Sequence, residues 1–315
     1  MPENEIDLRV QLGPMAMKNP IATASGCSGY GKELAAFYNL SRLGAVVTKS
    51  ITLRPREGHP PPRLVEVRAG MLNAIGLANV GLDEFLSEKL PALAAFDVPV
   101  IANVAGSTPD EYIEVCRAMD AAAGVAGIEL NVSCPNVAHG GIEFGTEAAA
   151  LARLVGAVRN VVSRAALLVK LSPNVTDIAV PARAAADAGA DALSLVNTLR
   201  GMAIDPWTGR PALTNTTGGL SGPAIKPVAV YMIRRVWQEV AGPRGVPILG
   251  LGGIQFPEDV IEFLRAGATA VSVGTANFVD PETCAVLVDG VRDALGRLGV
   301  ARAADLVGRI ETPGA

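Results

Sequence analysis

The chain has 315 residues, a formal net charge of −4 and a pI near 5.4, so its acidic balance argues against a nucleic-acid partner. No apolar run reaches the roughly 18 residues that span a bilayer, and the first residues lack the apolar segment of a signal peptide. We therefore expect a cytoplasmic protein without a membrane partner. The four cysteines are far apart and there are only two histidines, which disfavours a metal site, an iron–sulfur cluster or a disulfide framework.

Short apolar runs alternate with helix-like segments along the whole chain, as expected of parallel strands covered by helices. The predicted strands span residues 20–24, 45–48, 99–104, 127–132, 167–171, 192–196, 247–251 and 270–273. The predicted helices span 34–43, 109–122, 147–162, 177–188, 223–240, 257–264 and 282–295. Eight such units predict an α/β fold, a single (β/α)8 TIM barrel domain over residues 1–315. An open doubly wound sheet is the alternative, because periodicity does not prove closure.

Four irregular segments interrupt this alternation. Residues 8–19, with Gly13-Pro14 in the middle, predict an N-terminal hairpin at the bottom of the barrel. Long loops follow strand 2 (51–82), strand 4 (137–145) and strand 6 (199–222). Long loops in compact domains are often functional, and these three follow the carboxyl ends of strands, where barrel active sites lie. We expect the loops after strands 4 and 6 to form the lid over a site.

The most informative motif is Asn131-Val132-Ser133-Cys134-Pro135-Asn136, which follows an apolar strand. Carboxamides donate and accept hydrogen bonds, and a thiol can act as a base or nucleophile if its pKa falls. The alternative is a buried cysteine before a turn. Cys27, Cys116 and Cys284 are expected to be packing residues.

Other strand ends are also polar. Lys49 and Lys170 each end an apolar strand, where a lysine is costly to bury, although a lysine can also snorkel at the barrel rim. Glycines follow strands 7 and 8 at Gly252-Gly253 and Gly274-Thr275. Because glycine lets backbone N–H groups approach a phosphate, these loops predict a phosphorylated ligand.

Seven motifs in order across the chain resemble those of the class 1 dihydroorotate dehydrogenases, most closely the class 1B catalytic subunit. They are Thr48-Lys49-Ser50, Asn73-Ala74-Ile75-Gly76-Leu77, the Asn131 to Asn136 motif, Val169-Lys170-Leu171-Ser172-Pro173, Asn197-Thr198, Gly219-Leu220-Ser221-Gly222 and Gly252-Gly253-Ile254. One departure is Val80, which stands where the class 1B pattern usually has a proline, and this could loosen the loop over the substrate.

The resemblance implies an FMN enzyme that oxidises dihydroorotate to orotate in UMP biosynthesis. The implied FMN contacts are Ser25, Lys49, Ser50, Asn103, Asn131, Lys170, Val196, Gly222, Gly252, Gly253, Gly274 and Thr275. The implied substrate contacts are Lys49, Asn73, Ala74, Ile75, Gly76, Leu77, Asn131, Asn136, Asn197 and Thr198. Cys134 would take the C5 proton while the C6 hydride passes to flavin N5, and Lys170 would lie at the N1/O2 edge of the ring.

The same resemblance implies a homodimer that joins an electron-transfer subunit, carrying FAD and a 2Fe–2S cluster, in a heterotetramer that reduces NAD⁺. The sequence leaves three alternatives open. They are a class 1A enzyme that reduces fumarate, a subunit of the dihydropyrimidine dehydrogenase type, and a non-catalytic phosphate-binding barrel.

Overall fold

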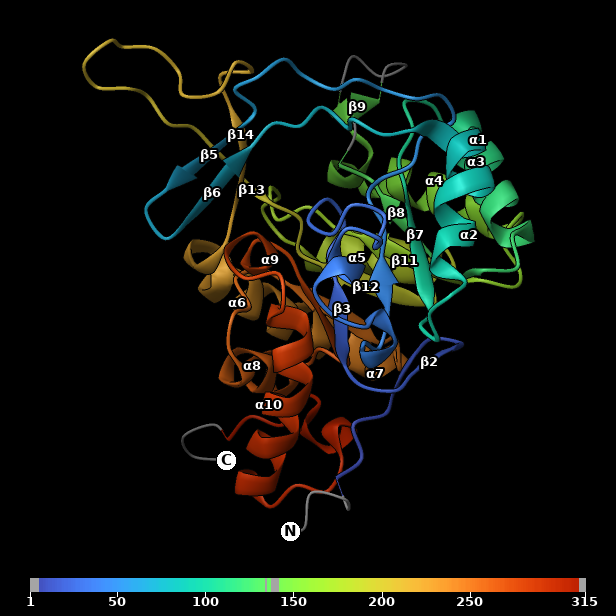
Figure 1. Cartoon of the computed structure of the whole chain (residues 1–315). Coiled ribbons are helices and arrows are strands. Elements are labelled where there is room, and N and C mark those ends of the chain that lie inside the picture. The colour runs from blue at the N-terminus through green and yellow to red at the C-terminus, as the bar shows by residue number, and fades with distance from the viewer. Residues whose placement is uncertain (1–5, 134, 137–141, 312–315) are drawn as a thin grey trace.

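Eight parallel strands form a closed barrel with helices on its outer face (Figure 1). The computed structural model describes residues 6–133, 135–136 and 142–311, with only the backbone at 135, 136, 142 and 143. The strand order is β3-β16-β15-β12-β11-β8-β7-β4, and a parallel bridge between Ala22 and Ala45 joins the first strand to the last. The barrel strands are β3 (Ile21–Thr23), β4 (Val46–Val47), β7 (Val100–Val104), β8 (Val125–Asn131), β11 (Ala166–Lys170), β12 (Ala192–Leu195), β15 (Ile248–Leu251) and β16 (Ala270–Val273). The eight predicted strands and the TIM barrel are confirmed.

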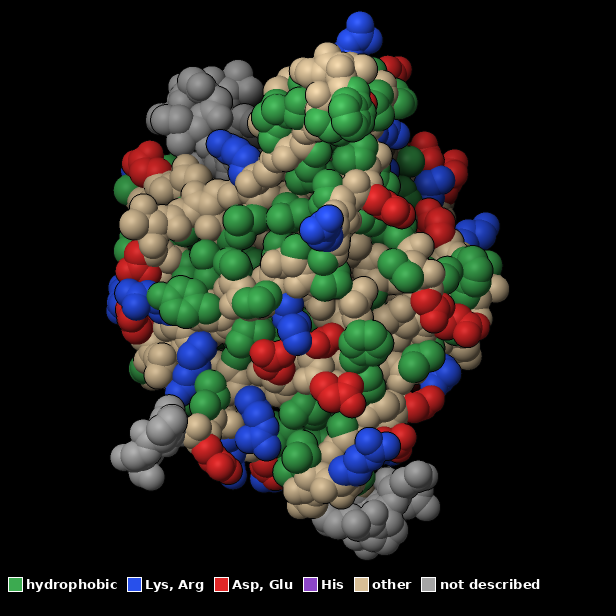
Figure 2. All heavy atoms as spheres, turned by 90° about the vertical axis from the view of Figure 1, so that its left-hand side faces the viewer, with side chains coloured by type: hydrophobic (Ala, Val, Ile, Leu, Met, Phe, Trp, Pro, Cys, Tyr) green, Lys and Arg blue, Asp and Glu red, His purple; other side chains and the backbone are tan. Residues whose placement is uncertain are grey.

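The core of the barrel is aliphatic, as the low aromatic content requires. Both faces of the strands are buried, since the barrel interior and the helices cover them. On the face shown in Figure 2, acidic and basic side chains are interspersed, without a continuous region of one sign. No helix in the described part of the chain has the length and apolar character needed to cross a membrane.

The helices mostly match the predicted segments. They are α1 (Gly81–Glu84), α2 (Leu90–Leu93), α3 (Pro109–Ala121), α4 (Ala148–Arg159), α5 (Ala179–Asp187), α6 (Lys226–Val236), α7 (Gly242–Arg244), α8 (Pro257–Ala266), α9 (Ala276–Val279) and α10 (Thr283–Leu298). Two π turns, η4 (Phe85–Lys89) and η8 (Trp237–Ala241), join α1 to α2 and α6 to α7. Thr108 caps α3 by accepting a hydrogen bond from the Glu111 amide.

The short helices α7 and α9 were not predicted, and two longer segments also differ from the prediction. The helix expected at 34–43 is wrong, because the structure has two 3₁₀ turns there, η2 (Leu34–Ala36) and η3 (Leu40–Arg42). Asn39 separates them with an extended backbone, and its side chain caps the second turn by accepting from the Ser41 amide. The helical run at 81–93 was not predicted. Pro91 has no backbone N–H, so it interrupts the series of helical hydrogen bonds in this run. The wider π turn η4, just before it, accommodates the missing donor.

The N-terminal hairpin is confirmed as β1 (Val10–Leu12) and β2 (Met15–Met17). Its turn residue Gly13 has a φ of +61° and lies against Asp191, which immediately precedes β12. Met17 is buried and lies beside Gly44, near the start of β4. The hairpin therefore packs against the amino ends of the barrel strands, opposite the expected site.

The long loops after the second and sixth barrel strands combine into one structure that the sequence did not predict. The first contributes β5 (Leu64–Val67) and β6 (Gly70–Asn73), and the second contributes β13 (Leu199–Gly201) and β14 (Gly218–Ser221). They form an antiparallel sheet in the order β13-β14-β6-β5, at the upper left of Figure 1. The loop after β8 forms the two-residue strands β9 (Pro135–Asn136) and β10 (Ile142–Glu143), and residues 137–141 between them lie outside the described residues.

Candidate active site

A cavity of about 500 Å³ opens where the barrel strands end, beneath the four-stranded sheet. This volume lies within the range of small-molecule and cofactor sites. Its lining includes these predicted residues: Ser25, Lys49, Ser50, Asn73, Ala74, Ile75, Gly76, Leu77, Asn131, Lys170, Val196, Asn197, Thr198, Gly222, Gly252, Gly253, Gly274 and Thr275. The structure thus brings together side chains that are up to 250 residues apart in the chain, at the position that barrel geometry predicts.

Three predicted residues do not belong to this lining. Asn103 is fully buried beneath the cavity, where it contacts Ser50 rather than the open space. The side chain of Asn136 and the whole of Cys134 lie outside the described residues. The roles of these three, like those of the residues that line the cavity, stay predictions.

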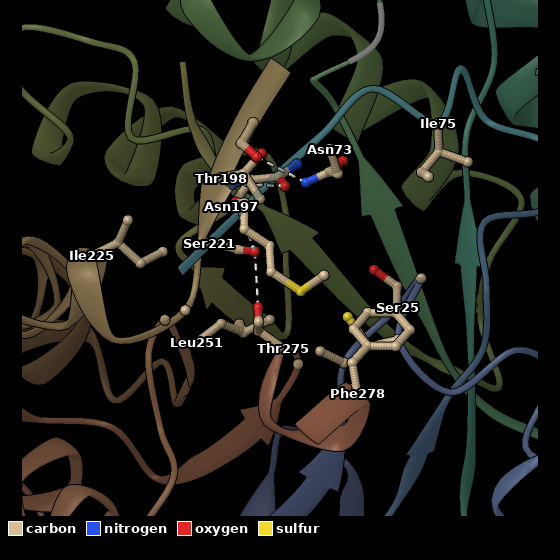
Figure 3. A pocket seen from close by; sticks show the side chains of 18 of the residues that line it. Ser25, Asn73, Ile75, Asn197, Thr198, Ser221, Ile225, Leu251, Thr275 and Phe278 are labelled. Atoms are coloured by element: carbon tan, nitrogen blue, oxygen red, sulfur yellow. Dashed lines mark hydrogen bonds between the residues drawn. The ribbon is translucent and has the colours of Figure 1, made fainter. Parts of the chain in front are cut away.

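Carboxamides gather at one end of the cavity (Figure 3). The Asn197 amide donates to Ser133 Oγ at 2.9 Å and to Asn131 Oδ1 at 3.4 Å, and its own Oδ1 accepts from the Thr198 amide. Asn73 donates to the Gly219 carbonyl on β14 at 3.0 Å. These side chains are held by one another, so their remaining donors and acceptors present a fixed pattern to a polar ring.

Glycines crowd the opposite end. A methyl group on Gly253 would lie 2.8 Å from the Gly222 carbonyl oxygen, and one on Gly222 would lie 2.9 Å from Gly70 Cα. Gly222, Gly252 and Gly253 all have φ values between +80° and +130°, which glycine alone adopts readily. Thr275 donates to Ser221 Oγ at 2.8 Å and joins this end to the four-stranded sheet (Figure 3). The result is a close-packed backbone surface of the kind that binds phosphate.

A buried cation and a buried carboxylate lie at the floor of the cavity. The Lys170 ammonium donates to Ser25 Oγ at 3.0 Å and lies 3.8 Å from Glu129 Oε1. Glu129 Oε1 also accepts from Asn103 Nδ2 at 2.6 Å, and Asn103 Oδ1 accepts from Ser50 Oγ at 2.5 Å. A hydrogen-bonded network thus runs below the cavity from β8 through β7 to the residues after β4.

Two further cationic residues, Lys49 and Arg63, line the cavity. Partial burial and the neighbouring Arg63 charge hold the pKa of Lys49 below its usual value. Arg63 is fixed by donating to the carbonyl oxygens of Glu57 and His59. This pair makes part of the cavity electropositive, which suits a carboxylate or another anion.

The loop at 73–77 is held in a conformation that requires support. Gly76 and Leu77 both have φ values near +60 to +70°, and the left-handed region costs a residue with a side chain about 1–2 kcal/mol. Asn79 donates to the Leu77 carbonyl oxygen at 2.7 Å, and the Val80 amide donates to Tyr30 Oη at 3.1 Å. A proline at position 80 could not make the second bond, so Val80 supplies an anchor here.

Sequence reasoning missed several residues of the site. Glu129 lies two residues before Asn131 on β8, and alternate residues of a strand point to the same face. This spacing could have indicated that Glu129 faces the barrel interior, as Asn131 does. Arg63 had no local signal. His59, which had no predicted role, donates through Nδ1 to the Ala74 carbonyl oxygen at 3.0 Å and supports the 73–77 loop.

The cysteines expected to be packing residues have high pKa values. Cys116 and Cys284 are fully buried. Cys27 lines the cavity, but burial raises its pKa to about 11, so its thiol stays protonated near neutral pH. Among the described cysteines, none has the lowered pKa of a reactive thiol.

The fold and site together define a (β/α)8 barrel of the enzyme type, with a polar pocket at the strand carboxyl ends. The chain belongs to the dihydroorotate dehydrogenase family: the model of that family, described as dihydroorotate dehydrogenase, matches residues 7–295. The family that the seven sequence motifs indicated is therefore confirmed.

Relatives of known name are similar to the chain over almost its full length. A protein of Geotalea daltonii named "Dihydroorotate dehydrogenase B (NAD(+)), catalytic subunit" is 52% identical over 305 residues, which are 97% of this chain and 98% of the relative. Proteins with the same name from Geobacillus kaustophilus and Pelobacter propionicus are 54% and 52% identical, over 98% and 97% of this chain and 97% and 99% of the relatives. These similarities favour class 1B over class 1A.

Proposed function

We propose that this protein is the catalytic subunit of an NAD⁺-linked dihydroorotate dehydrogenase, which oxidises dihydroorotate to orotate in pyrimidine biosynthesis. The single observation that carries the proposal is the near full-length identity of over 50% to proteins of that name. The cavity supports it independently, because the carboxamides and cations in its lining suit a small ring with amide edges and a carboxylate.

The residues of the cavity fit FMN as the cofactor. Gly252, Gly253, Gly274 and Thr275 would hold its phosphate. Gly222 packs so closely against this group that a methyl group on Gly253 would lie 2.8 Å from its carbonyl oxygen. Lys170, buried at the cavity floor, would lie against the ring edge that gains negative charge on reduction. FMN would supply the hydride acceptor for the reaction.

The chain's own residues would bind, orient and deprotonate the substrate. Lys49 and the 73–77 loop would hold its carboxylate, while Asn131, Asn197 and Thr198 would bind its amide edges. Cys134, in the motif after β8, would take the proton from C5 as a general base, an effect typically worth about 10²–10⁴-fold in rate. Asn136 would be a further substrate contact.

The proposal includes partners and a location. The protein would be a cytoplasmic homodimer in a heterotetramer with a subunit that carries FAD and a 2Fe–2S cluster. The similar proteins are named as the catalytic subunit of an NAD⁺ enzyme, which supports the need for a partner that passes electrons to NAD⁺.

The test is anaerobic reduction of the purified protein. We expect a yellow protein that releases FMN on denaturation and is bleached by dihydroorotate, but not by dihydrouracil. Adding the electron-transfer subunit should confer NAD⁺ reduction, whereas fumarate should not reoxidise the chain efficiently. A colourless protein that takes up no FMN would refute the enzymatic assignment, and rapid turnover with fumarate alone would refute the class 1B assignment.

A further inference from the structure

Glu129 is a carboxylate buried in the barrel interior. Its side chain has no exposed surface. Because side chains alternate along a strand, Glu129 lies on the same inner face of β8 as Asn131. Oε1 accepts from Asn103 at 2.6 Å, whereas Oε2 has no hydrogen-bond partner among the described residues. A buried carboxylate that is only half satisfied is costly, so it needs a compensating charge.

Lys170 supplies that charge. Its Nζ lies 3.8 Å from Glu129 Oε1, and its side chain is only 7% exposed. On the cavity side the same ammonium donates to Ser25 Oγ at 3.0 Å, and both Lys170 and Ser25 line the cavity. The ammonium therefore lies between a buried negative charge and the ligand space.

Glu129 also reaches the other floor residues through hydrogen bonds. Asn103 donates to Glu129 through Nδ2 and accepts from Ser50 Oγ through Oδ1. Ser50 Oγ in turn accepts from Asn131 Nδ2 at 3.4 Å. A change of charge at Glu129 therefore acts on Lys170 directly and on Asn131 through two intermediate side chains.

We propose that Glu129 is a positioning residue: an ionised counter-ion that fixes the Lys170 ammonium and offsets part of the positive charge that the cavity floor presents to the flavin ring. This inference rests on the proposed FMN function. Glu129 touches neither ligand directly, since it does not line the cavity. Its charge would lower the tendency of the flavin to be reduced, because reduction places negative charge on the ring.

The test is the midpoint potential of the bound flavin in holoprotein, measured against a reference dye. Glu129→Gln keeps the shape and removes the charge, so we expect a rise in the equilibrium constant for flavin reduction on the order of tenfold. Glu129→Asp should return the potential towards that of the wild type. Asp293→Asn, which removes an exposed charge on α10, should leave it unchanged. A potential unmoved by Glu129→Gln would mean a protonated or merely structural Glu129 and overturn the inference.

A double-mutant cycle gives a second measurement that needs no flavin. In the apoprotein, Glu129→Gln and Lys170→Gln should each lower the melting temperature, and the double variant should lose less than the sum of the two. Strictly additive losses would overturn the pairing even if a single variant fails to retain FMN. Failure of the wild type to bind FMN would instead count against the proposed function and leave the apoprotein cycle to decide the role of Glu129.

Discussion

Gly253→Ala should weaken FMN binding far more than it weakens the fold. At a φ of +80° an alanine costs about 1–2 kcal/mol relative to glycine. In addition, the new methyl group would lie 2.8 Å from the Gly222 carbonyl oxygen and 2.8 Å from Lys226 Cβ, so the local backbone must move. This backbone belongs to the proposed phosphate cradle, formed by Gly222, Gly252, Gly253, Gly274 and Thr275. We expect at least a tenfold loss of FMN affinity, equivalent to about 1.4 kcal/mol.

Gly245→Ala is the matched control. Gly245 has a φ of +65°, ends α7 and has open space where a methyl group would stand, so it carries the backbone cost without the contact. Both variants should melt a few degrees lower, roughly 2–4 °C for each kcal/mol. FMN affinity can be measured by equilibrium dialysis with flavin fluorescence. Equal FMN affinity in the two alanine variants would refute the phosphate cradle.

Three further outcomes follow from the site. Cys134→Ala should keep bound FMN but lose most of the flavin bleaching that dihydroorotate causes. In the wild type the rate of this bleaching should rise with pH towards a thiol pKa of about 8.5. A rate that does not change between about pH 6 and 9 would exclude the thiol as the base. Since burial and Arg63 lower the pKa of Lys49, orotate affinity measured by calorimetry should fall as alkaline pH is approached, and Arg63→Gln should move that fall to higher pH. The same lowered pKa means that the unfolded chain binds more protons, so this lysine's contribution to stability rises with pH between its folded and unfolded pKa values. Asn197→Ala, which removes the donor to Asn131 and Ser133, should raise the KM for dihydroorotate roughly tenfold while FMN retention is unchanged.

The barrel could be predicted because its signals are local. Each strand is a short apolar run that ends at a glycine, proline or polar residue, and each following helix shows its own periodicity. The errors occur where local signals conflict. At 34–43 the apolar pattern is helical, but the Asn39 side chain accepts from the Ser41 amide and starts a separate 3₁₀ turn. At 81–93 the proline at position 91 argued against a helix that the structure contains. The pairing of β14 with β6 joins segments about 150 residues apart, so no window of sequence contains it.

The polar strand ends of the site were predictable for the same reason as the barrel. Once the strands are placed, parallel closure brings Lys170, Asn131 and Asn197 to one end. Arg63 was not predictable, because its position depends on how the second loop folds back and on bonds to two backbone carbonyls. Glu129 was visible as a charged residue in an apolar strand, but its partners come from two other strands.

The two ends of the cavity depend on different supports, and this separates their functions. The carboxamide end is tied to the four-stranded sheet, since Asn73 bonds Gly219 and a methyl group on Gly219 would collide with Thr198. The glycine end rests mainly on the barrel loops after β15 and β16. It also contacts the sheet through Gly222, which follows β14 and packs on Gly70 of β6, and through the bond from Thr275 to Ser221. Movement of the sheet would therefore alter the proposed substrate contacts first and leave most of the phosphate cradle in place. Such an arrangement allows a substrate to exchange while a cofactor stays bound, as the proposed reaction requires.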